Sequence, residues 1–159
     1  MTIKVGDRLP NVTFRVMTAE GPKPKTADEV FKGKKVALFG MPGAFTGGCH
    51  GKHMPTVVQN VAALKSKGVD TVAVTAVNDP FVLGAWQQAI GSDEVELLGD
   101  GNCEFATAIG LTFDGSKIGL GTRSQRYSML VEDGVVKQIN VEQPGKFEIS
   151  GGDTLLKQL

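Results

Sequence analysis

One cysteine, Cys49, lies in a stretch whose pattern favours nucleophilic or redox chemistry at sulfur. It follows a short apolar run, residues 36–39, that predicts a buried strand, and a loop with Pro42 and several glycines separates the two. Apolar residues then recur at helical spacing over residues 54–64. Cys49 is therefore expected in the first turn of a helix, where free N–H groups carry partial positive charge and favour an anion. Because the thiolate is the reactive form of cysteine, this position predicts a reactive thiol.

The elements that must position Cys49 alternate between strands and helices. Strands are predicted at residues 12–17, 36–39, 70–77, 95–98, 127–131 and 135–141. Helices are predicted from Cys49 to about residue 67, over 81–90, over 103–109, and at the C-terminal end with Asp153 as its cap. Residues 21–24 are predicted as a turn, residues 114–121 as a glycine-rich loop, and Thr26 to Glu29 as a capping box.

This order predicts the fold class. Alternating strands and helices imply a mainly parallel sheet, and the Asp133-Gly134 turn predicts a closing antiparallel hairpin. We therefore predict an α/β protein with a thioredoxin-like fold, in which helices flank a central mixed sheet. Residues 1–159 are expected to form one such domain.

The composition argues against several classes of partner. The 159 residues carry 17 Lys and Arg against 17 Asp and Glu, which predicts no basic surface for nucleic acid or an anionic membrane. No apolar run is long enough to span a bilayer, and the first residues lack the apolar core of a signal peptide. The two cysteines are then expected as free thiols in a reducing compartment, most simply the cytoplasm.

The stretch around Cys49 resembles the active-site sequence of the peroxiredoxins. Residues 42–49 read Pro-Gly-Ala-Phe-Thr-Gly-Gly-Cys, which matches the family pattern Pro-x-x-x-Thr-x-x-Cys. His53 and Pro55 follow, and segments 77–82 and 126–129 are similar to later segments of the peroxiredoxin-5 subgroup (type II, atypical). The resemblance covers nearly the whole chain. It departs at Gly47-Gly48, where the subgroup commonly has Pro-Thr, and at His50, where it has a small polar residue.

The resemblance implies reduction of hydrogen peroxide and alkyl hydroperoxides. Cys49 would be the peroxidatic cysteine, which peroxide oxidises to a sulfenic acid. Arg126, rather than Arg123, would stabilise the thiolate and bind the peroxide oxygens. Thr46 would orient the peroxide, and Pro42 would shield the thiolate.

The same resemblance suggests the partners. Neither place that holds a resolving cysteine in this subgroup, the strand before Asn78 or residues 147–150, has a thiol here. Cys103 is predicted to be a partly buried structural residue, so an external thiol would regenerate Cys49: glutathione with glutaredoxin first, thioredoxin second. No cofactor is expected. A homodimer is implied, with Phe45, Phe81 and Trp86 near the active-site mouth and the contact.

Three other functions fit parts of the pattern. Cys49, His50 and His53 could belong to a zinc site, although a fourth ligand would have to come from Cys103 or a carboxylate. Cys49 and His53 could act as nucleophile and base of a hydrolase, but a base four residues away on the same helix matches a catalytic triad poorly. A thioredoxin-fold peroxide sensor without turnover is the third.

Overall fold

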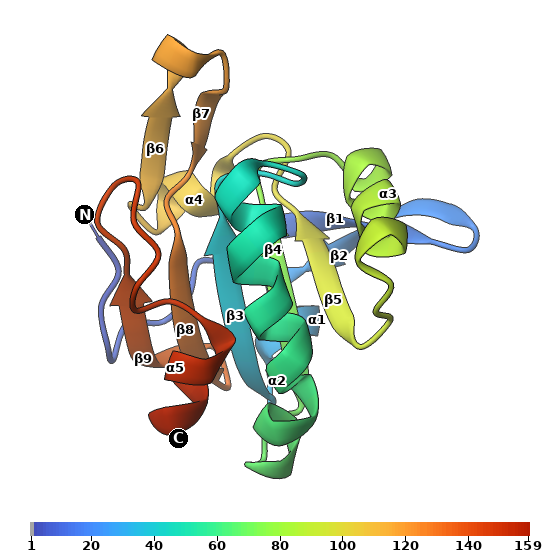
Figure 1. Ribbon diagram of the computed structural model, residues 1–159. Helices are drawn as coiled ribbons and strands as arrows, with labels where there is room; N and C mark the ends of the chain where they lie inside the picture. Colours follow the sequence, from blue (N-terminus) through green and yellow to red (C-terminus); the bar gives the residue numbers. More distant parts are fainter. Residues whose placement is uncertain (1) are drawn as a thin grey trace.

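The computed structural model describes residues 2–159 and contains a seven-stranded sheet with helices on both faces (Figure 1). The strand order is β2-β1-β5-β4-β3-β8-β9. The three central strands are parallel, and the outer strands pair antiparallel to them or to each other. These strands are β1 (Thr13–Thr18), β2 (Gly21–Thr26), β3 (Lys35–Met41), β4 (Thr71–Ala76), β5 (Val95–Gly99), β8 (Tyr127–Glu132) and β9 (Val135–Val141). The predicted mixed sheet is confirmed.

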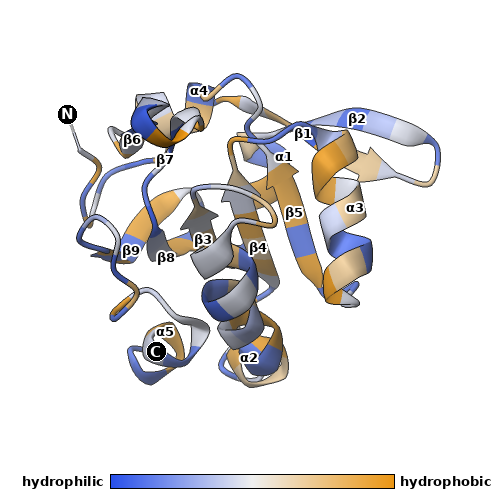
Figure 2. Ribbon diagram, turned by 45° about the horizontal axis from the view of Figure 1, so that its top comes forward, coloured by the Kyte–Doolittle hydropathy of each residue, from blue (hydrophilic) through white to orange (hydrophobic). Residues whose placement is uncertain are grey.

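Alternate residues of the central strands point into two apolar cores, one on each face of the sheet. In β3, Phe39 packs into the core under α2 (Met54–Ser66), α3 (Pro80–Ile90) and α5 (Gly152–Lys157), and Cys49 belongs to the same core. Its neighbour Leu38 packs into the other core, under α1 (Ala27–Phe31) and α4 (Glu104–Ala108). The middle strands carry much of the apolar sequence, whereas the edge strand β2 is polar (Figure 2). This alternation places the reactive cysteine on one defined face of the sheet.

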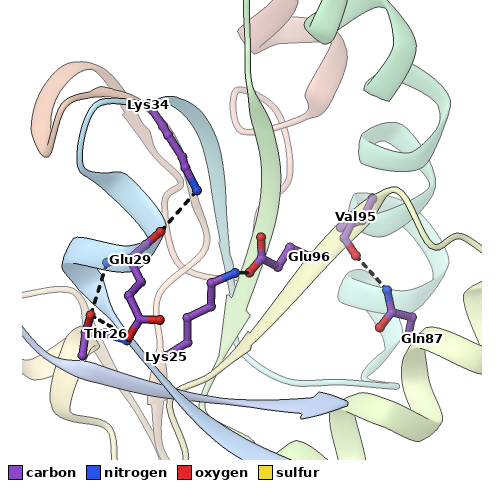
Figure 3. A network of polar contacts seen from close by, with 7 residues as sticks. All are labelled: Lys25, Thr26, Glu29, Lys34, Gln87, Val95 and Glu96. Carbon is purple, nitrogen blue, oxygen red and sulfur yellow. Dashed lines mark hydrogen bonds and ion pairs between the residues drawn. The ribbon is translucent and has the colours of Figure 1, made fainter. Parts of the chain in front are cut away.

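Side-chain contacts fix the ends of several elements (Figure 3). Thr26 accepts a hydrogen bond from the backbone N–H of Glu29 at 3.2 Å, and the Glu29 carboxylate accepts one from the backbone N–H of Thr26. The predicted capping box is therefore confirmed. Lys25 of β2 forms an ion pair with Glu96 of β5. The Asp133-Gly134 turn also has the predicted form, with positive φ at both residues.

Three local predictions are wrong. Residues 21–24 form part of β2 rather than a turn, because prolines are tolerated in an edge strand, where the missing N–H breaks no interior ladder. Residues 114–121 are a hairpin of β6 (Thr112–Gly115) and β7 (Gly121–Ser124) around the short helix η2 (Ser116–Ile118). This hairpin projects from the body of the molecule (Figure 1).

The third wrong prediction concerns the cap of α5. Gly151 is the N-cap, and Asp153 lies inside the first turn. The start of α5 is held against α2 at this point. The two helices are so close that a side chain at Gly152 would lie 2.5 Å from the backbone oxygen of Thr56. The backbone N–H of Gly152 instead donates to the Thr56 hydroxyl at 3.0 Å. Within residues 2–159, no helix combines the length and apolarity needed to cross a membrane.

Candidate active site

The loop that carries Cys49 leaves the carboxyl end of β3 and is held by two distant side chains. The backbone N–H of Ala44 donates to Oδ1 of Asn78, in the loop after β4, at 2.8 Å. Nη1 of Arg123, on β7, donates to the backbone oxygen of Pro42 at 3.3 Å. Directly after Ala44, Phe45 adopts a left-handed backbone conformation with φ of 62°. Contacts from outside the loop therefore determine its path.

Cys49 begins a π-helical turn, η1 (Cys49–His53), which continues into α2. The sequence predicts Cys49 in the first turn of a helix; the structure places it in such a turn, which is π-helical. Pro55 gives the physical reason: it has no N–H, and in an α-helix its ring would clash with the carbonyl of Gly51. A widened turn avoids this clash. π-Helical turns occur frequently at functional sites.

A buried network joins Cys49 to two other side chains. Cys49 has no exposed surface, and Nη2 of Arg126 donates to its sulfur at 3.2 Å. The other guanidinium nitrogen, Nη1, donates to Nδ1 of His53 at 3.0 Å. Because arginine can only donate, Nδ1 is the unprotonated nitrogen, and Nε2–H of His53 donates to the backbone oxygen of Ser150 at 2.7 Å. His53 thus aims the guanidinium at the sulfur.

His53 remains neutral in this network. Burial lowers its pKa from 6.5 to about 3, and the nearby positive charge of Arg126 acts in the same direction. The hydrogen bond to Ser150 and the charge of Glu142 oppose the shift. The neutral imidazole is the form that can accept a hydrogen bond from Arg126, so burial and hydrogen bonding favour the same protonation state.

Glu142 holds the loop that carries Ser150. Its Oε2 accepts hydrogen bonds from the backbone N–H groups of Glu148, Ile149 and Ser150, each at 2.8 Å, and from the Ser150 hydroxyl at 2.6 Å. Burial alone would raise the pKa of Glu142, but these hydrogen bonds hold it below its usual range. The ionised carboxylate therefore fixes Ser150, which in turn fixes His53.

A cleft of about 550 Å³ opens beside this network. Its floor includes Pro42, Gly48 and Arg126, and its walls come from the β6–β7 hairpin and from the loop between β9 and α5. Gly48 lies close to Arg126: a side-chain carbon there would lie 3.0 Å from Nη2, so the guanidinium would have to move by a few tenths of an ångström. The second glycine of the Gly47-Gly48 sequence, which departs from the family pattern, thus gives Arg126 more room, whereas a side chain at Gly47 would meet nothing within 4 Å.

Contacts and the cleft lining place Cys49, Arg126 and Pro42 together, and Thr46 lies in the same loop three residues before Cys49. Cys49 and Arg126 are in contact, and Pro42 lies on the floor of the cleft. The Thr46 hydroxyl donates to the backbone oxygen of Gly43 at 2.8 Å, which leaves its lone pairs free to accept. Arg123 has no hydrogen bond to Cys49 and contacts the loop backbone instead.

The aromatic residues expected at the mouth divide into two kinds. Phe45 and Phe81 are 49% and 66% exposed, but Trp86 is fully buried in the core. The interface position suggested for Trp86 is therefore wrong. Its Nε1–H donates to Nδ1 of His50 at 2.9 Å, and the Phe45 ring lies 6.3 Å from its own ring. Trp86 thus contacts, from within the core, residues on both sides of Cys49 in the chain.

The zinc and hydrolase interpretations gain no support from these contacts. Both ring nitrogens of His53 are engaged, by Arg126 and Ser150, and neither contacts Cys49. Nδ1 of His50 accepts from Trp86. In the part of the chain that the structure describes, no cluster of three or more His, Cys, Asp or Glu side chains could hold a metal ion.

Sequence reasoning considered His53 only as a ligand or a base and missed Glu142 and Ser150. The available signal was the spacing of Cys49 and His53, which places both on one side of the same helix. Glu142 had no such signal, since its partners are backbone N–H groups of a loop that the sequence leaves without regular structure.

We expect His53 to make folding stability depend on pH. The pKa of His53 is 6.5 in the unfolded chain and about 3 in the folded chain. The stability that comes from keeping His53 neutral in the folded chain is therefore complete above pH 6.5 and is lost as pH falls toward 3. Between pH 7 and pH 5 the loss is about 2 kcal/mol. Urea unfolding at both pH values should show a smaller difference for His53→Gln than for the wild type. The exposed His50 offers a control: a His50→Gln variant that flattened the profile equally would contradict this assignment.

Comparisons with known proteins agree on one family. The family model described as Redoxin matches residues 4–156. Peroxiredoxin-2E, chloroplastic, of Arabidopsis thaliana is 44% identical over 99% of this chain and 70% of its own length. Peroxiredoxin sll1621 of Synechocystis is 39% identical over 96% of this chain and 89% of its own. The crystal structure of reduced Prx3 from Vibrio vulnificus in complex with H₂O₂ superposes with a TM-score of 0.95, at 43% identity and 99% coverage of each chain.

Proposed function

The chain is a peroxiredoxin of the Redoxin family and hence a thiol-dependent peroxidase, and we propose that Cys49 is its peroxidatic cysteine. One observation carries this assignment: the half-buried Arg126 donates to the sulfur of the buried Cys49 at 3.2 Å, and a neutral histidine holds that arginine in place. A fixed guanidinium favours the thiolate and remains able to donate to a bound peroxide. The thioredoxin-like fold is shared with the solved peroxiredoxins that superpose on the chain.

The proposed step is a two-electron transfer from sulfur to peroxide. The Cys49 thiolate attacks the terminal peroxide oxygen, an S–O bond forms, and the O–O bond breaks. The departing hydroxide or alkoxide takes up a proton and leaves as water or an alcohol, and a sulfenic acid remains on Cys49. Arg126 stabilises the negative charge that moves onto the oxygens. Thr46 accepts from the peroxide O–H, and Pro42 limits the approach of water.

An external thiol completes the cycle. We infer glutathione with glutaredoxin as the first choice of reductant and thioredoxin as the second. One thiol attacks the sulfenic sulfur and releases water, and a second resolves the mixed disulfide and frees Cys49. No cofactor enters this scheme. A peroxide-consumption assay with each of the two reductant systems in turn tests the function; failure of both to sustain turnover would contradict it.

We expect Cys103 to be dispensable. It precedes α4, whose Phe105 packs into the core on the face of the sheet opposite to the Cys49 core. A disulfide needs Cα atoms within about 7 Å, and the sheet separates these two faces. Cys103→Ser should therefore retain nearly normal turnover with glutathione and glutaredoxin. A rapid Cys49–Cys103 disulfide in the wild type, with turnover lost in Cys103→Ser, would instead indicate a two-cysteine mechanism.

We also propose a homodimer whose contact includes Phe45 and Phe81. Both rings are exposed, and such aromatic surface is costly to leave in water. Light scattering at micromolar concentration should give the mass of a dimer, and Phe45→Ser with Phe81→Ser should shift it toward a monomer. A wild-type monomer in both the reduced and the oxidised state would remove this proposal.

The cytoplasm is the proposed compartment. Both cysteines are free thiols, which suits a reducing environment. Relatives carry the names chloroplastic and mitochondrial, so the family occurs in several compartments. Reducing conditions are what the proposed thiol-dependent cycle requires.

A further inference from the structure

The cleft beside Cys49 is much larger than hydrogen peroxide and is chemically uneven. Its outer wall carries the apolar side chains of Phe113, Ile118 and Leu120, from the β6–β7 hairpin and its tip. Ile118 is 70% exposed. The facing loop, between β9 and α5, adds Pro144 and Phe147. An apolar wall of this size fits the hydrocarbon part of an organic hydroperoxide.

Two lysines line the same cleft. Lys52 follows Cys49 in η1, and its ammonium makes no hydrogen bond or ion pair with any residue from 2 to 159. Lys146, in the loop between β9 and α5, has only a 3.9 Å contact with Glu148, and both of these side chains are largely exposed. Both ammonium groups are therefore available to a ligand in the cleft.

The two carboxylates that line the cleft form no ion pair with Lys52 or Lys146, and the lining carries three cationic side chains against these two carboxylates. Glu142 lines the cleft, but its Oε2 already accepts four hydrogen bonds. Asp114 is the other acidic lining residue, and its Oδ1 accepts from the backbone N–H of Ser116 in the hairpin. The guanidinium of Arg126 is directed to Cys49 and His53. The two lysines thus offer a cationic site that is separate from the reacting sulfur.

We propose that Lys52 and Lys146 bind the carboxylate of an amphiphilic substrate, a fatty acid hydroperoxide. The hydroperoxide group meets Cys49 and Arg126, the hydrocarbon chain lies along Phe113, Ile118 and Leu120, and the carboxylate pairs with the lysines. This inference rests on the proposed peroxidase function, and it adds a preference for acidic over neutral hydroperoxides. The lysines are specificity-determining residues that act on binding and not on the O–O bond.

The test compares two substrates that differ only in the carboxylate: a hydroperoxide of linoleic acid and its methyl ester. The rate of Cys49 oxidation is measured for each by stopped flow, and the acid-to-ester ratio is taken within each variant, so that a general change in Cys49 reactivity cancels. We expect the ratio to fall about threefold in Lys52→Gln or Lys146→Gln and about tenfold in the double variant. In the wild type the ratio should also fall as ionic strength rises from about 0.01 to 0.15 M.

Lys65→Gln is the matched control, since Lys65 lies near the end of α2 and lines a different cavity. It should keep the wild-type ratio. An unchanged ratio in the double variant overturns the inference. If the lysines serve glutathione instead, the double variant slows reduction of the sulfenic acid by glutathione and keeps the wild-type ratio, which also overturns it. Failure of hydrogen peroxide to oxidise wild-type Cys49 is a different result, and it contradicts the proposed function itself.

Discussion

Arg126→Lys should slow the reaction of the reduced protein with hydrogen peroxide by about a hundredfold. The loss of one preorganised hydrogen-bond donor has an effect of this size in enzymes that stabilise a developing negative charge. Lysine retains the positive charge but has a single nitrogen in place of the planar fork. In the wild type, one guanidinium nitrogen donates to the Cys49 sulfur and the other to His53. A single ammonium cannot reproduce both contacts with the same geometry. The second-order rate constant from stopped-flow fluorescence measures the effect.

Arg123→Lys is the matched control for this experiment. Arg123 is close in sequence, but it contacts the backbone oxygens of Pro42 and Leu120 and not the sulfur. We expect its replacement to change the rate by less than about tenfold, the cost of weakened loop contacts. Equal, small effects of both replacements would show that Arg126 has no special role in the reaction.

Cys49→Ser should abolish peroxide turnover and leave the fold intact. Serine has nearly the same size, so the buried position stays filled, but its hydroxyl is not ionised near neutral pH and cannot replace the thiolate. The measurement is peroxide consumption with glutathione and glutaredoxin, together with circular dichroism to check folding. Substantial turnover by a folded Cys49→Ser protein would mean that another group reacts with peroxide.

The sequence was sufficient to predict the sheet and its flanking helices, because hydrophobic periodicity reports directly on buried strands and helical faces. It was also sufficient to predict the pairing of Cys49 with Arg126, although here the family resemblance, and not any local pattern, selected Arg126 over Arg123. The other contacts between residues far apart in the chain, for which neither a local pattern nor the resemblance gave a signal, were not predicted.

The missed features share one physical cause. Whether Pro22 and Pro24 lie in a turn or in an edge strand depends on pairing with β1, which no local signal encodes. The cap of α5 depends on how closely that helix approaches Thr56. The roles of His53 and Glu142 depend on the path of the loop between β9 and α5, which brings Ser150 to both side chains.

The assignment of Cys49 as the peroxidatic cysteine is tested by finding which sulfur the peroxide oxidises. The reduced protein is treated with one equivalent of hydrogen peroxide in the presence of dimedone, a reagent that traps sulfenic acids, and is then analysed by peptide mass spectrometry. If Cys49 is the peroxidatic cysteine, a dimedone adduct forms on Cys49 and Cys103 keeps an unmodified thiol. An adduct on Cys103, with Cys49 still reduced, would contradict it.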